Sequence, residues 1–275
     1  GVFSQDRIGF GADGAAAASN QIGRFGMTGL AKAASSDGEE ILQVGAILAS
    51  HPEHRRGAHE QRFESGSGFA QGRVCALEET YVPITDLGFN RADAVYDVVT
   101  VGRGNFFRLE DHFSRFARSC EMMKLRNPYG EEELRHILNR LVALTGLKDA
   151  YVWWGVTRGA MPLKPRDRLN PEGFSNRFYA FVTPYIFICN DEQRTRGIDI
   201  RISADYVRIP PNSVDPRAKN FHGLDLALSL FEAGRFGSDW SVLTYGKGNL
   251  AEAPGSNIFV IKNGVVATPE IGCLE

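Results

Sequence analysis

The sequence lacks the features that assign a chain to a nucleic-acid-binding, metal-binding or membrane-spanning class. Its 31 Lys and Arg are balanced by 33 Asp and Glu, so no excess of positive charge predicts a nucleic acid or a membrane as a partner. It has four cysteines, all far apart, and without a CxxC pair neither a zinc site nor a dithiol is indicated. No run approaches the roughly 18 apolar residues of a membrane helix, and no secretory leader pattern is present. We therefore predict a cytoplasmic protein without a metal site.

Composition divides the chain into an N-terminal extension and two expected domains. Residues 1–61 contain an Ala run and many Gly and Ser, and we expect an extension with one helix candidate over 39–50. Beyond it, strand and helix patterns alternate, which indicates an α+β fold. The Pro- and charge-rich loop 160–176 predicts a boundary between a small α/β domain at 62–165 and a larger domain at 166–275. The second domain ends within a strand pattern, so we expect it to be incomplete at the C-terminus.

Periodicity locates the main helices and strands. Apolar residues recur at helical spacing over 109–123 and 131–144, and both helices are expected to cover one sheet. Asn263-Gly264 predicts a β-hairpin because both turn positions need positive φ. The helix expected over 224–233 is apolar on nearly all sides, which predicts that it is buried. The expected strands are 68–74, 81–85, 94–101, 151–157, 178–188, 198–209, 257–262 and 265–268.

Lys219 is the first candidate for chemistry. It lies in Asp215-Pro-Arg-Ala-Lys219-Asn220, between an expected strand and the apolar helix. Spacing alone favours an exposed loop lysine. A loop stiffened by three prolines could instead hold the amine where it is desolvated and neutral enough to attack an aldehyde. The residues by themselves leave both readings open.

Glu252 and Arg115 are two further candidates with ordinary alternatives. Glu252 precedes a Gly-containing turn and a strand; it is either a turn carboxylate or an acid facing the ring nitrogen of a pyridoxal electron sink. Arg115 lies about 200° round its helix from apolar Phe113, which favours a solvated arginine. A planar guanidinium also matches a phosphate group well.

Several motifs in fixed order resemble a known family. Over about residues 66–275 the chain is similar to class IV pyridoxal-phosphate aminotransferases, the branched-chain/D-amino-acid type of fold type IV, and within that class to the (R)-selective amine transaminases. The resemblance is carried by Asp86-Leu-Gly-Phe89, Arg91 to Val99, Phe106 to Arg115, Asp149-Ala-Tyr151, Val156-Thr-Arg-Gly159, Val182 to Ile186, Asp215-Pro216 with Lys219-Asn220, and Glu252 with Asn257.

The resemblance implies a two-domain enzyme that uses pyridoxal 5'-phosphate and forms a homodimer with its active site at the domain interface. It implies that Lys219 is the Schiff-base lysine and moves the substrate proton. It also implies that the phosphate is bound by Arg115 and the pyridine nitrogen by Glu252, with Asn257 as a further cofactor-binding residue. The expected substrate pocket contains Tyr96, Val98, Tyr151 and Lys164. The substrates would be an amine or amino acid and a keto acid.

Departures from the family pattern keep other functions open. Arg91 and Trp153 stand where the amine transaminases have a His and an acidic residue, and Lys164 falls near a loop arginine that engages carboxylates. A C-terminal Gly-hydrophobic-Thr-Arg stretch that cups the phosphate is absent, which predicts weak cofactor binding. The alternatives are a D-amino-acid or branched-chain aminotransferase, an aminodeoxychorismate lyase, or a non-catalytic truncated relative.

Three other signals are interpreted as unrelated to catalysis. The G-x-G-x-x-G match at 9–14 has no strand before it, so it does not indicate a dinucleotide site. The irregular spacing of His51, His54 and His59 favours a solvated loop over a metal cluster. His112 is interpreted as a packing or supporting residue, not as a general base.

Overall fold

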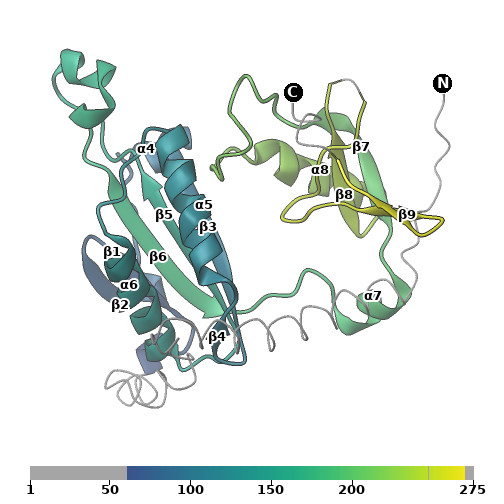
Figure 1. The fold of residues 1–275 in the computed structure, drawn as a ribbon, viewed down its shortest axis with the longest axis horizontal. Helices are drawn as coiled ribbons and strands as arrows, with labels where there is room; N and C mark the ends of the chain where they lie inside the picture. The colour runs from purple at the N-terminus through teal and green to yellow at the C-terminus, as the bar shows by residue number, and fades with distance from the viewer. Residues whose placement is uncertain (1–60, 247, 270–275) are drawn as a thin grey trace. The chain divides into compact units, whose positions relative to one another are not determined.

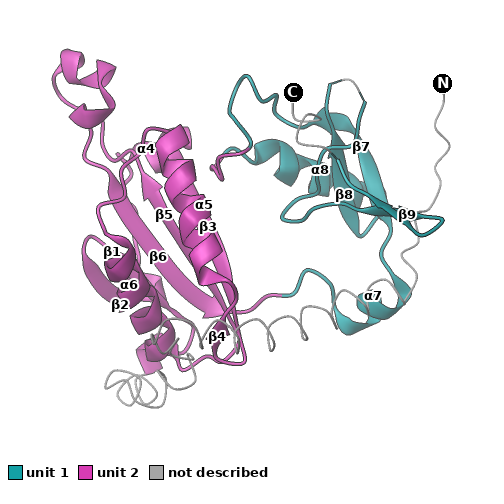
Figure 2. Ribbon diagram, in the orientation of Figure 1, with its two compact units in different colours: residues 1–31, 187–216, 222–275 teal, residues 32–186, 217–221 magenta. Residues whose placement is uncertain are grey.

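The chain folds into two compact units. The fold is described from a computed structural model for residues 61–246 and 248–269. Unit 1 contains the described residues 187–216 and 222–269, and unit 2 contains 61–186 together with 217–221 (Figure 2). The extension expected at 1–61, including its helix candidate, lies outside the described residues except for Gln61, which begins the short helix η1 (Gln61–Phe63).

Unit 2 is built on one antiparallel sheet of six strands (Figure 1). The expected strand at 81–85 is wrong: Pro83 has no N–H to donate to a ladder, and its carbonyl accepts a turn hydrogen bond from Asp86 N at 2.9 Å. The sheet order is β2-β1-β6-β5-β3-β4. Its strands are β1 (Ser67–Ala70), β2 (Arg73–Ala76), β3 (Ala94–Gly102), β4 (Asn105–Phe106), β5 (Ala150–Thr157) and β6 (Arg177–Pro184).

The expected domain boundary between 165 and 166 is wrong. Strand β6 follows that boundary in the sequence, yet it pairs with both β5 and β1 inside the sheet of unit 2. The loop 160–176, which holds η3 (Pro165–Leu169) and η4 (Pro171–Gly173), is therefore an excursion between two adjacent strands. The units divide between Ile186 and Phe187.

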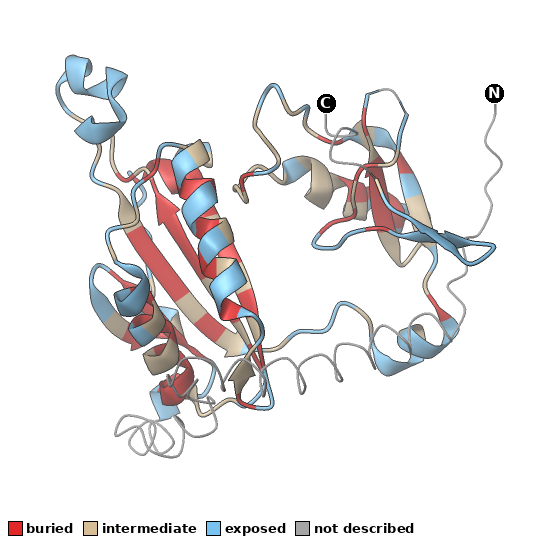
Figure 3. Cartoon of the chain, in the orientation of Figure 1, coloured by how far each residue is buried: buried red, intermediate tan, exposed pale blue. Residues whose placement is uncertain are grey.

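Two helices cover one face of this sheet, as predicted. Helix α5 (Leu109–Met122) and helix α6 (Glu131–Thr145) begin and end close to the expected residues. The residue after α6 is Gly146, whose φ of 67° gives the left-handed cap that glycine permits. Apolar side chains of both helices pack on alternate residues of the strands, such as Val95, Val152 and Val182, in one continuous core. Many residues that point to the opposite face of the sheet have intermediate burial, which Figure 3 colours tan.

Unit 1 is a smaller assembly. Strands β7 (Ile200–Val207) and β8 (Trp240–Thr244) run parallel, and α8 (Leu224–Arg235) packs on both. The predicted hairpin is confirmed as β9 (Val260–Lys262) and β10 (Val265–Ala267), with positive φ at Asn263 and Gly264. The expected burial of the helix at 224–233 is wrong, since Leu224 and Phe231 are 72% and 73% exposed. In the described part of the chain, the two strands cover only one side of α8.

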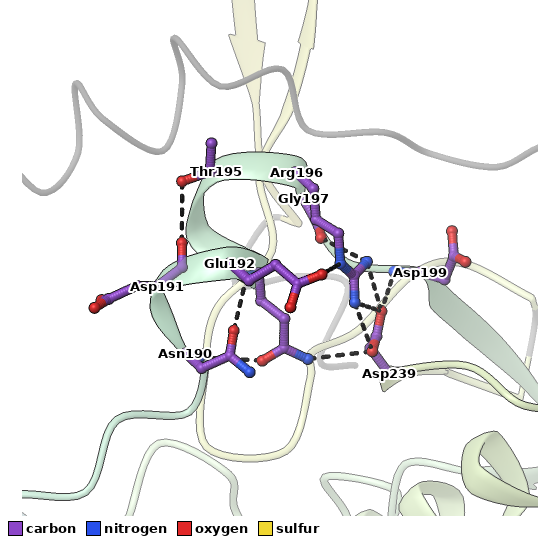
Figure 4. A network of polar contacts seen from close by, with 9 residues as sticks. Asn190, Asp191, Glu192, Thr195, Arg196, Gly197, Asp199 and Asp239 are labelled. Atoms are coloured by element: carbon purple, nitrogen blue, oxygen red, sulfur yellow. Dashed lines mark hydrogen bonds and ion pairs between the residues drawn. The ribbon is translucent and has the colours of Figure 1, made fainter.

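A polar network fixes the short helix α7 (Asp191–Arg196) within unit 1 (Figure 4). Asn190 caps its first turn by accepting from Gln193 N at 2.8 Å. Asp239 accepts hydrogen bonds from the side chains of Gln193 and Arg196 and from the backbone of Asp199. The Asp199 N–H and the Arg196 guanidinium lower the pKa of Asp239. One carboxylate thus joins α7 to the beginning of the β7–β8 pair.

Candidate active site

The backbone of Lys219 lies along the edge of the sheet in unit 2. Its carbonyl accepts a hydrogen bond from Tyr96 N at 2.9 Å, and its N–H donates to Ser119 Oγ at 3.1 Å. The next residue, Asn220, forms an antiparallel bridge with Val95 of β3. Both backbone groups of Lys219 are therefore fixed by elements far away in the sequence.

The Lys219 side chain lies on the half-buried face of the sheet, opposite α5 and α6. Because side chains alternate along extended backbone, the bridge places Lys219 and Phe221 on the same face as Tyr96. Lys219 Nζ lies 4.5 Å from the centroid of the Tyr96 ring, and the Phe221 ring packs edge-on against Tyr96 at 5.6 Å. An amine in this position can contact a flat group lying on the same face.

Aromatic side chains of three strands extend this face away from Lys219. Trp153 of β5 stacks on Phe181 of β6 at 5.2 Å and on Tyr96 of β3 at 5.9 Å, with interplanar angles of 17° and 21°. Tyr151 packs against Phe181 at 6.1 Å, and Val98 is paired with Trp153 in the strand register. We call this surface the aromatic face; it consists of Tyr96, Val98, Tyr151, Trp153, Phe181 and Phe221.

The aromatic face contains three of the four predicted pocket residues. Lys164 is not among them: it is exposed and precedes η3 in the loop between β5 and β6. Phe181 and Phe221 were not predicted from the sequence. The alternation of Tyr151 and Trp153 does mark one face of β5, and Phe181 is the residue of β6 that pairs with Trp153 on that face. Burial, followed by the nearby Tyr96, raises the pKa of the Tyr151 hydroxyl above its ordinary value, so this group is a neutral hydrogen-bond donor near pH 7.

Arg115 of α5 is held by a buried carboxylate on β3. Its Nε and Nη2 donate to the two oxygens of Asp97 at 2.8 and 2.7 Å, and His112 Nδ1 lies 2.8 Å from Asp97 Oδ1. The Arg115 side chain remains 41% exposed, whereas Asp97 is fully buried. His112 also packs edge-on against Trp154 at 6.5 Å, which agrees with its interpretation as a supporting residue.

The charges of this cluster stabilise one another. Burial alone would raise the pKa of Asp97, but the hydrogen bonds from Arg115 and His112 outweigh it and hold that pKa below the ordinary value. The bond to Asp97 in turn raises the pKa of Arg115. Asp97 was missed from the sequence. The signal that could have indicated it is an acidic residue at a core-facing position between Val95 and Val99, because a buried carboxylate needs a cationic partner.

Glu252 belongs to unit 1 and is held by a buried arginine. Arg208 Nε donates to Glu252 Oε1 at 2.6 Å, and Arg208 Nη1 donates to Asp225 Oδ2 at 2.8 Å. Arg208 is 7% exposed and Glu252 is 33% exposed. Burial would lower the pKa of Arg208, but its bonds to the two carboxylates outweigh this and raise it. Asn257, also predicted as a site residue, is exposed and precedes β9.

Comparison with known proteins identifies the family. The profile of the amino-transferase class IV family matches residues 94–275, more than half of the chain. This chain belongs to the class IV aminotransferases. Among its relatives, D-alanine aminotransferase of Listeria monocytogenes is 30% identical over 191 residues, which cover 70% of this class IV chain and 63% of the relative. The branched-chain-amino-acid aminotransferase of Pseudomonas aeruginosa is 30% identical over 171 residues, or 62% of this chain and 54% of the relative.

Solved structures confirm the predicted fold of this class IV chain. The branched-chain aminotransferase of Escherichia coli has a TM-score of 0.69 at 21% identity, covering 76% of this chain and 69% of that one. The branched-chain aminotransferase of Thermoproteus uzoniensis with norvaline has a TM-score of 0.64 at 24% identity, covering 74% and 67%. Another branched-chain aminotransferase, solved with pyridoxamine 5'-phosphate, has a TM-score of 0.65 at 22% identity, covering 76% and 68%. The matched part of the chain spans 63% of the Listeria D-alanine aminotransferase, a little under two thirds of that relative's length.

The described residues of this class IV chain contain neither a membrane-spanning helix nor a metal-binding cluster. No helix in 61–246 or 248–269 is long and apolar enough to cross a membrane. Within the same residues, no group of three or more His, Cys, Asp or Glu side chains is arranged to hold a metal ion. The three N-terminal histidines considered above lie outside these residues.

Proposed function

We propose that this class IV chain transfers amino groups with pyridoxal 5'-phosphate, using Lys219 as the reactive amine. The observation that carries the proposal is the position of Lys219: two hydrogen bonds fix its backbone, and its Nζ lies 4.5 Å from the Tyr96 ring on the aromatic face. A nucleophilic lysine needs such a defined position beside a surface that accepts a flat group.

Within each unit, taken by itself, a charged side chain suits one functional group of the cofactor. Arg115 uses Nε and Nη2 on Asp97, and Nη1 carries two further N–H donors that suit a phosphate. Glu252 uses Oε1 on Arg208, and a carboxylate has the capacity for further bonds, which suits a protonated ring nitrogen. When bound, pyridoxal phosphate supplies an electron sink that stabilises the negative charge left on the substrate carbon. Asn257 remains a proposed cofactor-binding residue.

Lys219 moves the proton in this proposal. Its Nζ accepts the proton from the substrate carbon and returns one during the second half of the cycle. The Tyr96 ring faces Nζ at cation–π distance and holds the amine on this face. Arg208 orients the Glu252 carboxylate, and Asp97 orients the Arg115 guanidinium. Each charged group is thus held in place before a ligand arrives.

We propose an amine or amino acid as donor and a keto acid as acceptor, with (R)-amines as the preferred donors. The motifs of the amine transaminases support this choice. The names of the relatives support D-amino acids or branched-chain amino acids as the alternative, and a homodimer is the assembly we propose. Lys164 is proposed to contact substrates from its exposed loop. A non-catalytic relative that holds no cofactor is the alternative from another class.

Covalent labelling tests the proposal directly. The protein is incubated with pyridoxal phosphate, reduced with borohydride and digested, and the label is expected on the peptide that contains Lys219. Lys219→Ala should lose the label, whereas Lys148→Ala, which changes an exposed lysine of the same unit, should keep it. Absence of label at Lys219, or equal labelling of Lys219→Ala, would contradict the enzymatic function and favour the non-catalytic alternative.

A donor panel then tests the subclass. We expect (R)-1-phenylethylamine to be used faster than its (S)-enantiomer, D-alanine or L-leucine with the same keto acid. Activity confined to L-leucine would contradict the amine branch, and activity confined to D-alanine would assign the chain to the D-amino-acid branch.

A further inference from the structure

Trp153 occupies space that a side chain at position 155 would otherwise fill. A Cβ built on Gly155 would lie 2.7 Å from Trp153 Cη2 and 3.1 Å from Cζ2, and 2.8 Å from the carbonyl oxygen of Val95. Real Cβ atoms do not approach so closely, so the indole can lie across the backbone here only because residue 155 is glycine. In the register, Gly155 is paired with Tyr96, so the indole extends toward the ring that faces Lys219.

Three neighbouring rings hold the indole in this orientation. Phe181 and Tyr96 stack on it nearly in parallel, at 5.2 and 5.9 Å, and Phe221 packs against it at 5.9 Å with an interplanar angle of 57°. Trp153 itself is half-buried. A ring fixed by its neighbours loses little conformational entropy when it contacts a ligand, so its free edge is suited to an edge contact with another ring.

Apart from the Lys219 amine, which the proposed reaction uses, the aromatic face offers little to a negatively charged side chain. Among the described residues of β3, β5 and β6 whose parity places them on this face, Arg177 is the one cation. It is paired with buried Asp86 at 3.4 Å, and Asp86 also accepts from Tyr179 and Thr157, so this arginine has a carboxylate already. Burying a carboxylate against the rings without a paired cation would be costly.

We propose that Trp153, whose indole extends over Gly155, is a specificity-determining residue of the aminotransferase. Its free edge packs against a flat, uncharged substituent of the amine or carbonyl substrate, and the residue discriminates against substrates with a second carboxylate. This inference rests on the proposed function, because it takes the Lys219 amine as the reacting group. Trp153 stands where the amine transaminases have an acidic residue, so this contact with the substrate is not one that the quoted family motifs supply.

The test compares Trp153→Leu with wild type. Removing the indole should lower kcat/KM for (R)-1-phenylethylamine by about 3- to 10-fold, as expected for one aromatic pair. It should leave kcat/KM for 2-butylamine, which has no ring, within about 2-fold. Trp153→Phe keeps a ring and should recover most of the preference. Phe89→Leu, which changes an exposed aromatic residue of α4 (Leu87–Arg91) in the same unit, is the matched control and should behave as wild type.

A binding measurement gives a readout that is independent of turnover. Acetophenone, an uncharged ring ketone, should bind wild type and Trp153→Phe, and bind Trp153→Leu about 3- to 10-fold more weakly in saturation-transfer NMR. Glutarate, which has two carboxylates and no ring, should bind none of them appreciably. An unchanged acetophenone affinity in Trp153→Leu, absence of acetophenone binding to wild type, or tight glutarate binding to wild type would each overturn the inference.

The labelling experiment separates the two possible failures. If wild type and Trp153→Leu both take up cofactor at Lys219 but show the same preference between ring and ring-free amines, the role of Trp153 is wrong and the proposed function stands. If neither variant is labelled at Lys219, the proposed function fails, and the acetophenone measurement still decides whether Trp153 binds flat, uncharged ligands.

Discussion

Unit 2 and unit 1 hold their candidate site residues by different physical means. In unit 2 the Lys219 segment is attached to a six-stranded sheet whose other face is a continuous apolar core with two helices. In unit 1 the described apolar core is small, centred on Val242, Ala253 and Ile258, and Glu252 is positioned by an ion pair with Arg208. The position of the Lys219 segment therefore depends on the packed sheet that carries it, whereas the position of the Glu252 carboxylate depends on an ion pair.

The largest expected effect is loss of core packing in unit 2. Leu138 of α6 is fully buried in the core, so Leu138→Ala should destabilise the protein by about 3 kcal/mol through lost burial and a residual cavity. Urea unfolding monitored by circular dichroism measures the change. Leu163→Ala, at a position 94% exposed, is the control and should have almost no effect. A loss below about 1 kcal/mol in Leu138→Ala would show that the sheet of unit 2 does not depend on this core.

The second prediction removes a buried charge from unit 1. Glu232 of α8 accepts bonds from Ser203 Oγ, Arg201 Nε and two backbone N–H groups. Burial would raise its pKa, but these bonds outweigh burial and lower the pKa to about 2. Glu232→Gln should therefore cost on the order of 2 kcal/mol at neutral pH.

The pH dependence of that cost has a defined sign. A carboxyl group with a depressed folded-state pKa stabilises the protein fully above its unfolded value of 4.5 and loses this contribution as the pH falls toward 2. Hydrogen exchange of α8 peptides from pH 5 down to pH 2 should show the difference between wild type and Glu232→Gln shrinking. A difference that stays constant over this range would contradict the assigned ionisation.

The third prediction applies the charge argument to unit 2. Asp97→Asn leaves Arg115 without its carboxylate partner, but Arg115 is 41% exposed, so water compensates for part of the loss. We expect about 1–2 kcal/mol of destabilisation. We also expect roughly tenfold weaker binding of pyridoxal phosphate, because the guanidinium is no longer oriented. Fluorescence titration measures the affinity. An unchanged affinity with reduced stability would give Asp97 a purely structural role.

The difference between local and non-local interactions explains which features could be predicted from the sequence. Helices α5 and α6 were predicted almost to the residue because their periodicity and the glycine after α6 are local signals. The domain boundary was wrong because the partners of β6 are β1 and β5, and β1 lies about a hundred residues earlier in the chain. The apolar composition of α8 predicted that it is buried, but burial also requires elements that cover the helix, and among the described residues β7 and β8 cover only one side of it.

The candidate site follows the same rule. Lys219, Arg115 and Glu252 could be proposed as site residues because they belong to short ordered motifs. Their partners Asp97 and Arg208 were not, because each pairing is made only when distant segments fold together. The same holds for the stacking of Trp153 on Phe181, whose strands are separated by the long loop 160–176.

The smallest expected effect concerns backbone strain at the glycine that follows one helix in each unit. Gly146 after α6 and Gly237 after α8 have φ of 67° and 74°, and replacing either by Ala should cost about 1 kcal/mol from the left-handed backbone alone. Gly102→Ala, at a glycine with open space around it and no positive φ, should cost almost nothing. Urea unfolding should give similar losses for Gly146→Ala and Gly237→Ala, because backbone strain depends on φ and not on the surrounding core. If Gly146→Ala were several times more costly than Gly237→Ala, the packed core of unit 2 would be coupled even to its helix cap.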